Sequence, residues 1–105
     1  MTLNEFYNLI KKSSIPFKYH HFEKKDEVKP PFGVYYSPNT ENFMADGAVY
    51  IKSNRIIVEL YTQKRDLAVE KKIEDIFDNA ELYYTEESVY LDDEKLFMKI
   101  YNLEV

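Results

Sequence analysis

Two stretches of the sequence carry side chains that bind metal ions. His20 and His21 are adjacent, and imidazole nitrogen is a common zinc ligand. Successive residues of an extended segment point to opposite faces, so we expect this pair not to share one ion. Asp92, Asp93 and Glu94 offer the oxygen ligands that Mg²⁺ and Ca²⁺ prefer, but without the spacing and glycine of a calcium loop, and are more typical of a hairpin turn. With no cysteine either, the sequence predicts no metal site.

Residues for covalent or acid–base catalysis lack a supporting motif. A metal-dependent nuclease needs an Asp and a Glu-x-Lys on neighbouring strands, whereas Glu59 is followed two residues later by Tyr61. Ser53, Thr62 and Ser88 have no surrounding motif that would make a nucleophile. Only two glycines occur in the chain, so a phosphate-binding glycine-rich loop is not expected. We therefore predict no catalytic residues, no cofactor and no enzyme activity.

The net charge of −5 is unevenly distributed along the 105 residues. Residues 1–29 hold six lysines and four acidic residues, whereas residues 65–105 hold five basic and twelve acidic residues. Nucleic-acid-binding domains normally present a dense basic patch, so we expect no direct sequence-specific binding of nucleic acid. Two ends of opposite sign would suit a subunit that meets a neighbour, although solvation alone is the commoner reason for such asymmetry.

The size and composition are typical of one folded domain, expected to span residues 1–105. Hydrophobic residues make up 45% of the chain and aromatic residues 16%, which is unlike a disordered chain. No apolar run approaches the roughly 20 residues that span a membrane, and the opening MTLNEFYNLIKK lacks a signal-peptide pattern. We expect no membrane association, and the lack of cysteine agrees with a cytoplasmic origin.

Two segments have the apolar spacing of short helices. The first, residues 3–12, follows a capping box in which Thr2 and Glu5 exchange hydrogen bonds. The second, residues 66–78, begins at the capping residue Asp66 and is expected to end at a left-handed Asn79. The apolar positions are Leu3, Phe6, Tyr7 and Ile10 in the first helix and Val69, Ile73, Ile76 and Phe77 in the second. Glu70, Lys71, Glu74 and Asp75 are expected on the solvated face of the second helix.

Several segments have the alternation of β-strands. The segment 55–62 is the most apolar and is expected at the centre of the sheet, with Ile56, Val58 and Leu60 on one face. Residues 17–22 could form a strand or an extended arm. The predicted strands are 32–36, 49–52, 55–62, 81–91 and 95–103.

The order helix, strands, helix, strands predicts an α+β fold: a mostly antiparallel β-sheet with two short helices packed on one face. Many strand positions are apolar on both faces, so the second face needs a cover that two short helices cannot supply. Such a surplus indicates a protein interface. Tyrosine suits half-buried interfaces, although its β-propensity is the simpler reason for its place on strands. The interface candidates among the tyrosines are Tyr35, Tyr50, Tyr61 and Tyr101.

The stretch NTENFMADGAVY, residues 39–50, is predicted to be a polar loop with a turn at Asp46-Gly47. Phe43 and Met44 in its middle are large and apolar. Either Phe43 folds back over the sheet of its own chain, or Phe43 and Met44 project into a neighbouring subunit, since Met adapts well to irregular contacts.

Four segments together resemble a family of small phage and prophage proteins of Gram-positive bacteria, encoded among the head–tail joining and tail genes of long-tailed phages. The segments are KPPFGVYY, ENFMADGAVY, RIIVELYTQKRD and ESVYLDDEKLFMKIYNLEV. The likeness spans nearly the whole chain and rests on an overall pattern, not on a catalytic signature. It implies a tail-terminator-like subunit that assembles as a ring-shaped homo-oligomer, often a hexamer. Through the segment NF-x-AD, Asn42, Phe43, Ala45 and Asp46 become interface candidates.

The resemblance implies a structural role in virion assembly, as a tail-terminator, tail-completion or head–tail connector subunit. The expected partners are copies of the chain and other phage tail or connector proteins, and the expected location is the virion, assembled in the bacterial host cytoplasm. The alternative is a small cytoplasmic protein-interaction or regulatory domain that has no virion role and acts as a monomer.

Overall fold

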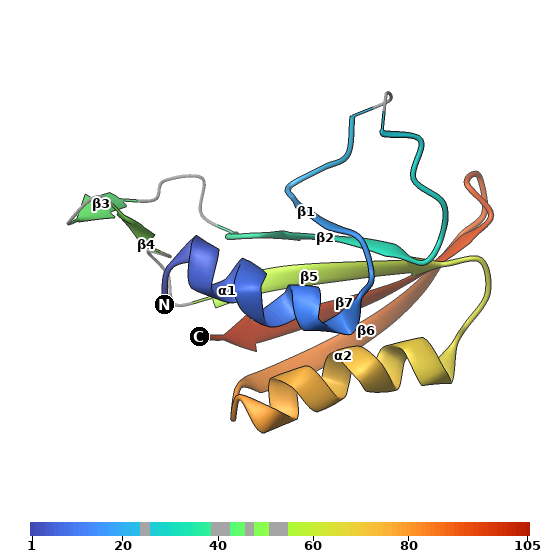
Figure 1. Ribbon diagram of the computed structural model, residues 1–105. Helices are drawn as coiled ribbons and strands as arrows, with labels where there is room; N and C mark the ends of the chain where they lie inside the picture. Colours follow the sequence, from blue (N-terminus) through green and yellow to red (C-terminus); the bar gives the residue numbers. More distant parts are fainter. Residues whose placement is uncertain (24–25, 39–42, 46–47, 51–54) are drawn as a thin grey trace.

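The computed structural model describes residues 1–23, 26–38, 43–45, 48–50 and 55–105, with the backbone alone in 43–45 and 48–50. A five-stranded sheet carries the helices α1 and α2 on one side, and a two-stranded sheet is separate (Figure 1). The predicted α+β fold is confirmed. The elements are α1 Leu3–Ile10, a 3₁₀ turn η1 Lys11–Ser13, β1 Phe17–Tyr19, β2 Phe32–Tyr36, β3 Phe43–Ala45, β4 Ala48–Tyr50, β5 Arg55–Thr62, α2 Leu67–Asn79, β6 Tyr83–Leu91 and β7 Leu96–Glu104.

The five-stranded sheet has the order β1-β2-β5-β7-β6. β5 pairs with β2 on one side and β7 on the other, so its predicted central position is confirmed. All pairs in this sheet are antiparallel except β1 with β2, which is parallel. Of the segment 17–22, Phe17–Tyr19 forms a strand. The strand ends there because the next residue, His20, has a φ of 70° and leaves the extended conformation.

The capping box of α1 forms as predicted: the Glu5 amide donates to Thr2 Oγ1 at 3.0 Å, and the Thr2 amide donates to Glu5 Oε1 at 2.9 Å. The amide of Val69 likewise donates to Asp66 Oδ1, which caps α2. The prediction that Asn79 is the left-handed residue after α2 is wrong. Asn79 is still helical, and the positive φ of 57° falls on Glu81.

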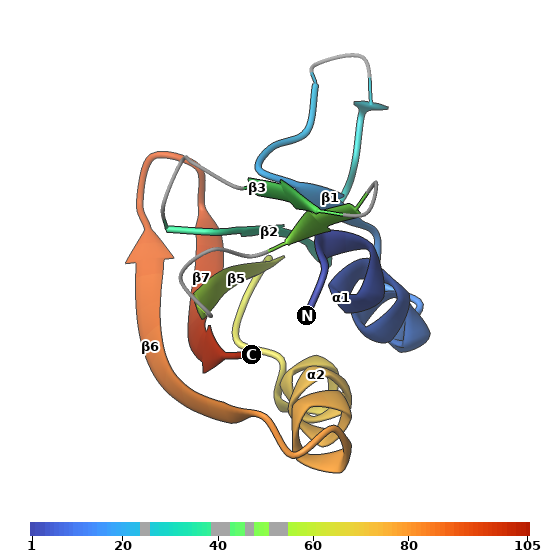
Figure 2. The ribbon, with the colours of Figure 1, turned by 90° about the vertical axis from the view of Figure 1, so that its left-hand side faces the viewer.

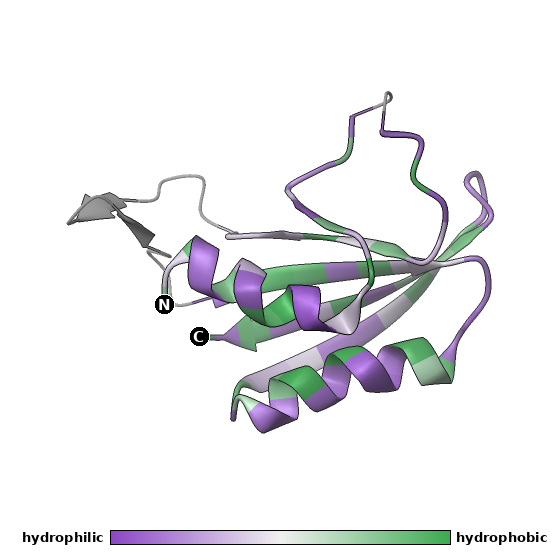
Figure 3. Ribbon diagram, viewed as in Figure 1, coloured by the Kyte–Doolittle hydropathy of each residue, from purple (hydrophilic) through white to green (hydrophobic). Residues whose placement is uncertain are grey.

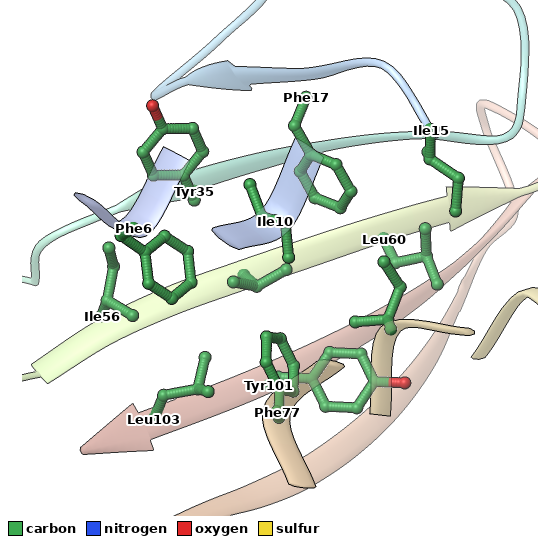
Figure 4. Close-up of a cluster of buried hydrophobic side chains, with 12 residues drawn as sticks. Phe6, Ile10, Ile15, Phe17, Tyr35, Ile56, Leu60, Phe77, Tyr101 and Leu103 are labelled. Carbon is green, nitrogen blue, oxygen red and sulfur yellow. The ribbon is translucent and has the colours of Figure 1, made fainter. Parts of the chain in front are cut away.

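The core lies between the helices and the inner face of the sheet (Figures 2 and 4). Phe6 and Ile10 of α1 and Phe77 of α2 are fully buried against β5 and β7. Figure 3 shows that hydrophilic residues alternate with hydrophobic ones along both helices. Each fully buried side chain of this size contributes about 1.5–3 kcal/mol to folding. The core positions are Phe6, Ile10, Ile15, Phe17, Tyr35, Ile56, Val58, Leu60, Ile73, Phe77, Tyr101 and Leu103.

Gly33 of β2 allows β1 and its helix connection to come close to the sheet. A Cβ added to Gly33 would clash with the ring of Phe17 and lie 2.8 Å from the carbonyl oxygen of Glu59. The Phe17 ring therefore occupies the space where a side chain at position 33 would be, which explains a glycine inside a strand.

The predicted loop 39–50 differs from the structure at Phe43–Ala45. Phe43–Ala45 forms β3, which pairs antiparallel with Ala48–Tyr50, so a short strand is present where a loop was predicted. The rest of the stretch lies outside the described residues. In the part of the chain that the structure describes, no helix is long and apolar enough to cross a membrane.

Candidate interaction surface

The face of the five-stranded sheet turned away from α1 and α2 is the strongest candidate for a site. We call it the open face; no helix of the described chain lies over it. Its side chains follow from the alternation of β5 and the register of its neighbours, which pair Val34 and Ile100 directly with Glu59. The open-face residues are Phe32, Val34 and Tyr36 of β2, Arg55, Ile57, Glu59 and Tyr61 of β5, Tyr83, Thr85, Glu87, Val89 and Leu91 of β6, and Leu96, Met98, Ile100, Asn102 and Glu104 of β7.

The open face is mostly apolar but only partly hidden from solvent. Val34 is buried and Val89 is 40% exposed, and most of the other side chains are half-buried. The rings of Phe32 and Tyr61 stack with centroids 5.0 Å apart, and Phe22 packs edge-on against Phe32. Phe22 covers part of Phe32, and the rest of this mostly apolar surface has no helix over it among the described residues, which indicates a contact site for another molecule. The predicted apolar surplus on the second face is therefore present.

Glu59 lies in the middle of this surface, on the central strand, and Glu87 of β6 lies on the same face across Ile100. Tyr36 Oη donates to Glu59 Oε2 at 2.7 Å and Tyr61 Oη donates to Glu59 Oε1 at 2.6 Å. No lysine, arginine or histidine among the described residues forms an ion pair with this carboxylate. Two neutral donors hold the carboxylate in place while its charge remains uncompensated, so this group is suited to binding a cation or a further hydrogen-bond donor.

The two tyrosines act as donors and not as bases. Burial raises the pKa of Tyr36 to about 12, and its hydrogen bond to Glu59 contributes to the shift. Burial also raises the pKa of Tyr61, again supported by the bond to Glu59. Both phenols therefore remain protonated at neutral pH, which favours binding over proton abstraction as the chemistry of this cluster.

Raising the pH above about 10 is expected to destabilise the protein, because tyrosine in the unfolded chain loses its proton near that value. The pKa values of Tyr35 and Tyr36 are raised to about 12 in the fold, so their stabilisation is complete below the unfolded pKa and is lost as the pH rises through the folded one. Urea unfolding should show a lower midpoint at about pH 11 than at about pH 8. The decline should be smaller in Tyr36→Phe, and equal stability at both pH values would contradict the assignment.

The sequence-derived interface residues fall into three groups. Tyr61 lies on the open face. Tyr101 is fully buried and Tyr35 is 6% exposed. The prediction is wrong for Tyr101, because its ring packs in the core and its hydroxyl donates to Glu74 Oε2 at 2.7 Å. The ring of Tyr35 packs at a tilt against that of Phe6 on the helix side, with centroids 5.6 Å apart. Asn42 and Asp46 lie outside the described residues, and for Phe43, Met44 and Tyr50 the structure describes the backbone alone.

A cluster of charged side chains on the helix-covered face of the sheet was not predicted. Lys99 of β7 is 3% exposed and lies 3.4 Å from Glu70 Oε1 and 3.0 Å from Glu86 Oε1. Arg65 Nε lies 3.5 Å from Glu70 Oε2, although that oxygen has no hydrogen-bond partner among the described residues. Glu70 was expected on the solvated face of α2 and is buried instead, because it turns towards Lys99. We call these four residues the inner ion cluster.

The inner ion cluster is suited to stability more than to chemistry. Burial alone would lower the pKa of the Lys99 ammonium, but the hydrogen bond to Glu86 and the charge of Glu70 outweigh this effect and raise it. The lysine is therefore fully protonated at neutral pH and is neither a base nor a nucleophile. A signal existed in the sequence, since Lys99 lies on the same strand face as Phe97 and Tyr101, so a charged residue stands between two aromatic ones on that face.

The two histidines come together, against the expectation that they point apart. Their Nδ1 atoms are 3.1 Å apart, because the positive φ of His20 turns the backbone after β1. His21 Nε2 is 3.0 Å from Glu23 Oε1 on the exposed surface. The Asp92-Asp93-Glu94 cluster forms the predicted exposed turn between β6 and β7. Among the described residues, no group of three or more His, Cys, Asp or Glu side chains is arranged to hold a metal ion.

Comparison with known proteins gives no assignment: no protein-family model matches this chain, and no curated protein matches it significantly.

Proposed function

We propose that this chain is a structural subunit of a phage particle, of the tail-terminator, tail-completion or head–tail connector kind, which acts by assembling into a ring and not by catalysis. It is made in the host cytoplasm and becomes part of the virion. Its partners are copies of itself and the tail or connector proteins on either side.

The open face is the observation that carries this proposal. It is a broad apolar surface on the side of the sheet opposite the helices, with a tyrosine-bound carboxylate at its centre. A protein whose one side is a bare sheet and whose other side is a helix layer has two different surfaces to offer (Figure 2). Contacts between two different patches produce rings when the rotation closes. The resemblance in KPPFGVYY and the three companion segments supplies the virion context.

Deletion of the gene tests the proposal directly. In an inducible lysogen, loss of the chain should give filled heads and tails that do not join, seen by electron microscopy, and plaque formation should fall to background. A plasmid copy should restore both, while a copy with an early stop codon should not. Infectious virions at the wild-type titre after deletion would refute the virion role and favour a cytoplasmic interaction domain. Neighbouring genes for a portal, a major tail protein and a tape measure are also expected.

A further inference from the structure

The charge of Glu59 sets the condition that any molecule on the open face must meet. Val34 and Ile100 flank Glu59 on the neighbouring strands, and Ile57 precedes it on the same face. A partner that covered this surface would remove the carboxylate from water. That removal is unfavourable unless the partner supplies a positive charge to the same point. An entirely apolar partner therefore does not fit, and a partner with a lysine or an arginine does.

Pairing two open faces would bring like charges together. Such a symmetric contact would bury two Glu59 and two Glu87 carboxylates in one interface, while Arg55, the cation on the strands of this face, lies at the end of β5 and donates to Asn102 Oδ1 at 3.0 Å. Like charges enclosed together oppose association. The open face of one copy therefore needs a different surface of its neighbour, which is the arrangement that a ring also requires.

The chain carries a matching cationic surface on the helix side. Lys11 and Lys12 are the exposed residues of the turn η1 at the end of α1, and no ion pair involves Lys12 among the described residues. The Lys11 ammonium lies 5.8 Å from the ring centre of Tyr7. Tyr7, one helical turn before Lys11, is 39% exposed. Tyr19, whose ring contacts Tyr35 as that of Tyr7 does, is 40% exposed, so aromatic area accompanies the lysines on this side. We call Tyr7, Lys11, Lys12 and Tyr19 the basic patch.

We propose that the open face of one copy binds the basic patch of the next copy, with Glu59 receiving Lys11 or Lys12. This inference deepens the proposed ring assembly and rests on it. The two surfaces lie on opposite sides of the sheet, because α1 packs on the side away from the open face (Figures 1 and 2). Copies joined in this way meet head to tail through two different surfaces, and they close into a ring where the rotation from one copy to the next brings the last copy back to the first. The tyrosine hydroxyls of Tyr36 and Tyr61 fix the carboxylate in advance, which lowers the entropy cost of the contact.

Sedimentation velocity of the full chain over a concentration series tests the contact. Wild type should self-associate, and Glu59→Gln should weaken association at least about tenfold, because it removes a charge-assisted contact while keeping a polar side chain for the tyrosines. Lys11→Glu combined with Lys12→Glu should weaken it similarly. Glu59→Lys in that background should restore association. Added salt should weaken wild type more than Glu59→Gln.

Glu81→Gln is the matched control, since it makes the same charge change at an exposed site after α2 and should leave association unchanged. Thermal melting of each variant separates a lost contact from a lost fold. Equal association of Glu59→Gln and wild type would overturn the inference, and so would a wild type that stays monomeric at its highest soluble concentration. Neither result touches the virion role, which the deletion experiment decides. If deletion of the gene leaves infectious virions while Glu59→Gln weakens the oligomer, the virion role alone is rejected.

Discussion

Replacing Lys99 with methionine is expected to lower the free energy of unfolding by about 3 kcal/mol, the lower end of what breaking a buried ion pair costs. Lys99 and Glu70 are both almost completely buried and lie 3.4 Å apart. Without the ammonium, Arg65 is the one remaining ion-pair partner of Glu70 among the described residues, and its side chain is 55% exposed. An unpaired buried carboxylate is unfavourable, so the loss exceeds the value of the pair itself.

Chemical denaturation followed by circular dichroism measures this effect, and the melting temperature should fall by roughly 15 °C for a domain of this size. The double variant Lys99→Met with Glu70→Leu should recover most of the loss, because well-packed apolar side chains can replace a buried ion pair at little cost. Lys71→Met is the control, since Lys71 pairs with Asp75 on the exposed side of the same helix and should change stability by less than about 0.5 kcal/mol. If Lys99→Met alone is as stable as wild type, then Glu70 does not depend on Lys99.

The elements that the sequence predicted well are those buried on one side only. A helix with one face in the core leaves a repeat of apolar residues, as Phe6 and Ile10 do in α1 and Ile73 and Phe77 do in α2. The same applies to the alternation of Ile56, Val58 and Leu60 on the central strand. Each pattern is local in the chain, so one-dimensional spacing was enough to find it.

Where both faces of a strand are apolar, spacing could not say which face is the core. β7 carries Tyr101 and Leu103 on the helix side and Met98 and Ile100 on the open face. Tyr101 was therefore predicted at an interface although it packs between α2 and the sheet. Only the position of α2 decides between the two faces, and that position depends on contacts between residues far apart in the sequence.

The contact of Glu59 with Tyr61 could be predicted from the sequence, but its contact with Tyr36 could not. Glu59 and Tyr61 stand two residues apart on a predicted strand, so they share a face by alternation. Tyr36 joins them only through the antiparallel register of β2 with β5, which the sequence does not state. The histidine pair was misjudged for the opposite reason. Adjacent side chains point to opposite faces only where the backbone is extended, and φ at His20 is positive.

Phe77→Ala is expected to destabilise the protein by about 4 kcal/mol, within the range measured for removing a fully buried aromatic ring. Phe77 has no exposed surface and makes edge-to-face contacts with Tyr101 and Tyr84, with ring centroids 5.4 and 5.5 Å away. These two tyrosines belong to β7 and β6, so the ring joins α2 to both strands. Its removal leaves a cavity and also takes away two aromatic contacts, each contributing about 0.5–1.5 kcal/mol beyond buried area.

The size of this effect relative to the whole fold makes Phe77→Ala a sharp test of the core. Domains are stable by about 5–15 kcal/mol in total, so this variant should be partly unfolded or melt roughly 20 °C lower by calorimetry. Phe77→Leu should lose less than half as much, because leucine fills part of the space. Leu67→Ala in the same helix is the control, since Leu67 is 66% exposed and should change stability by no more than about 0.5 kcal/mol. A loss below about 1 kcal/mol for Phe77→Ala would mean that α2 does not pack on β6 and β7 through this ring.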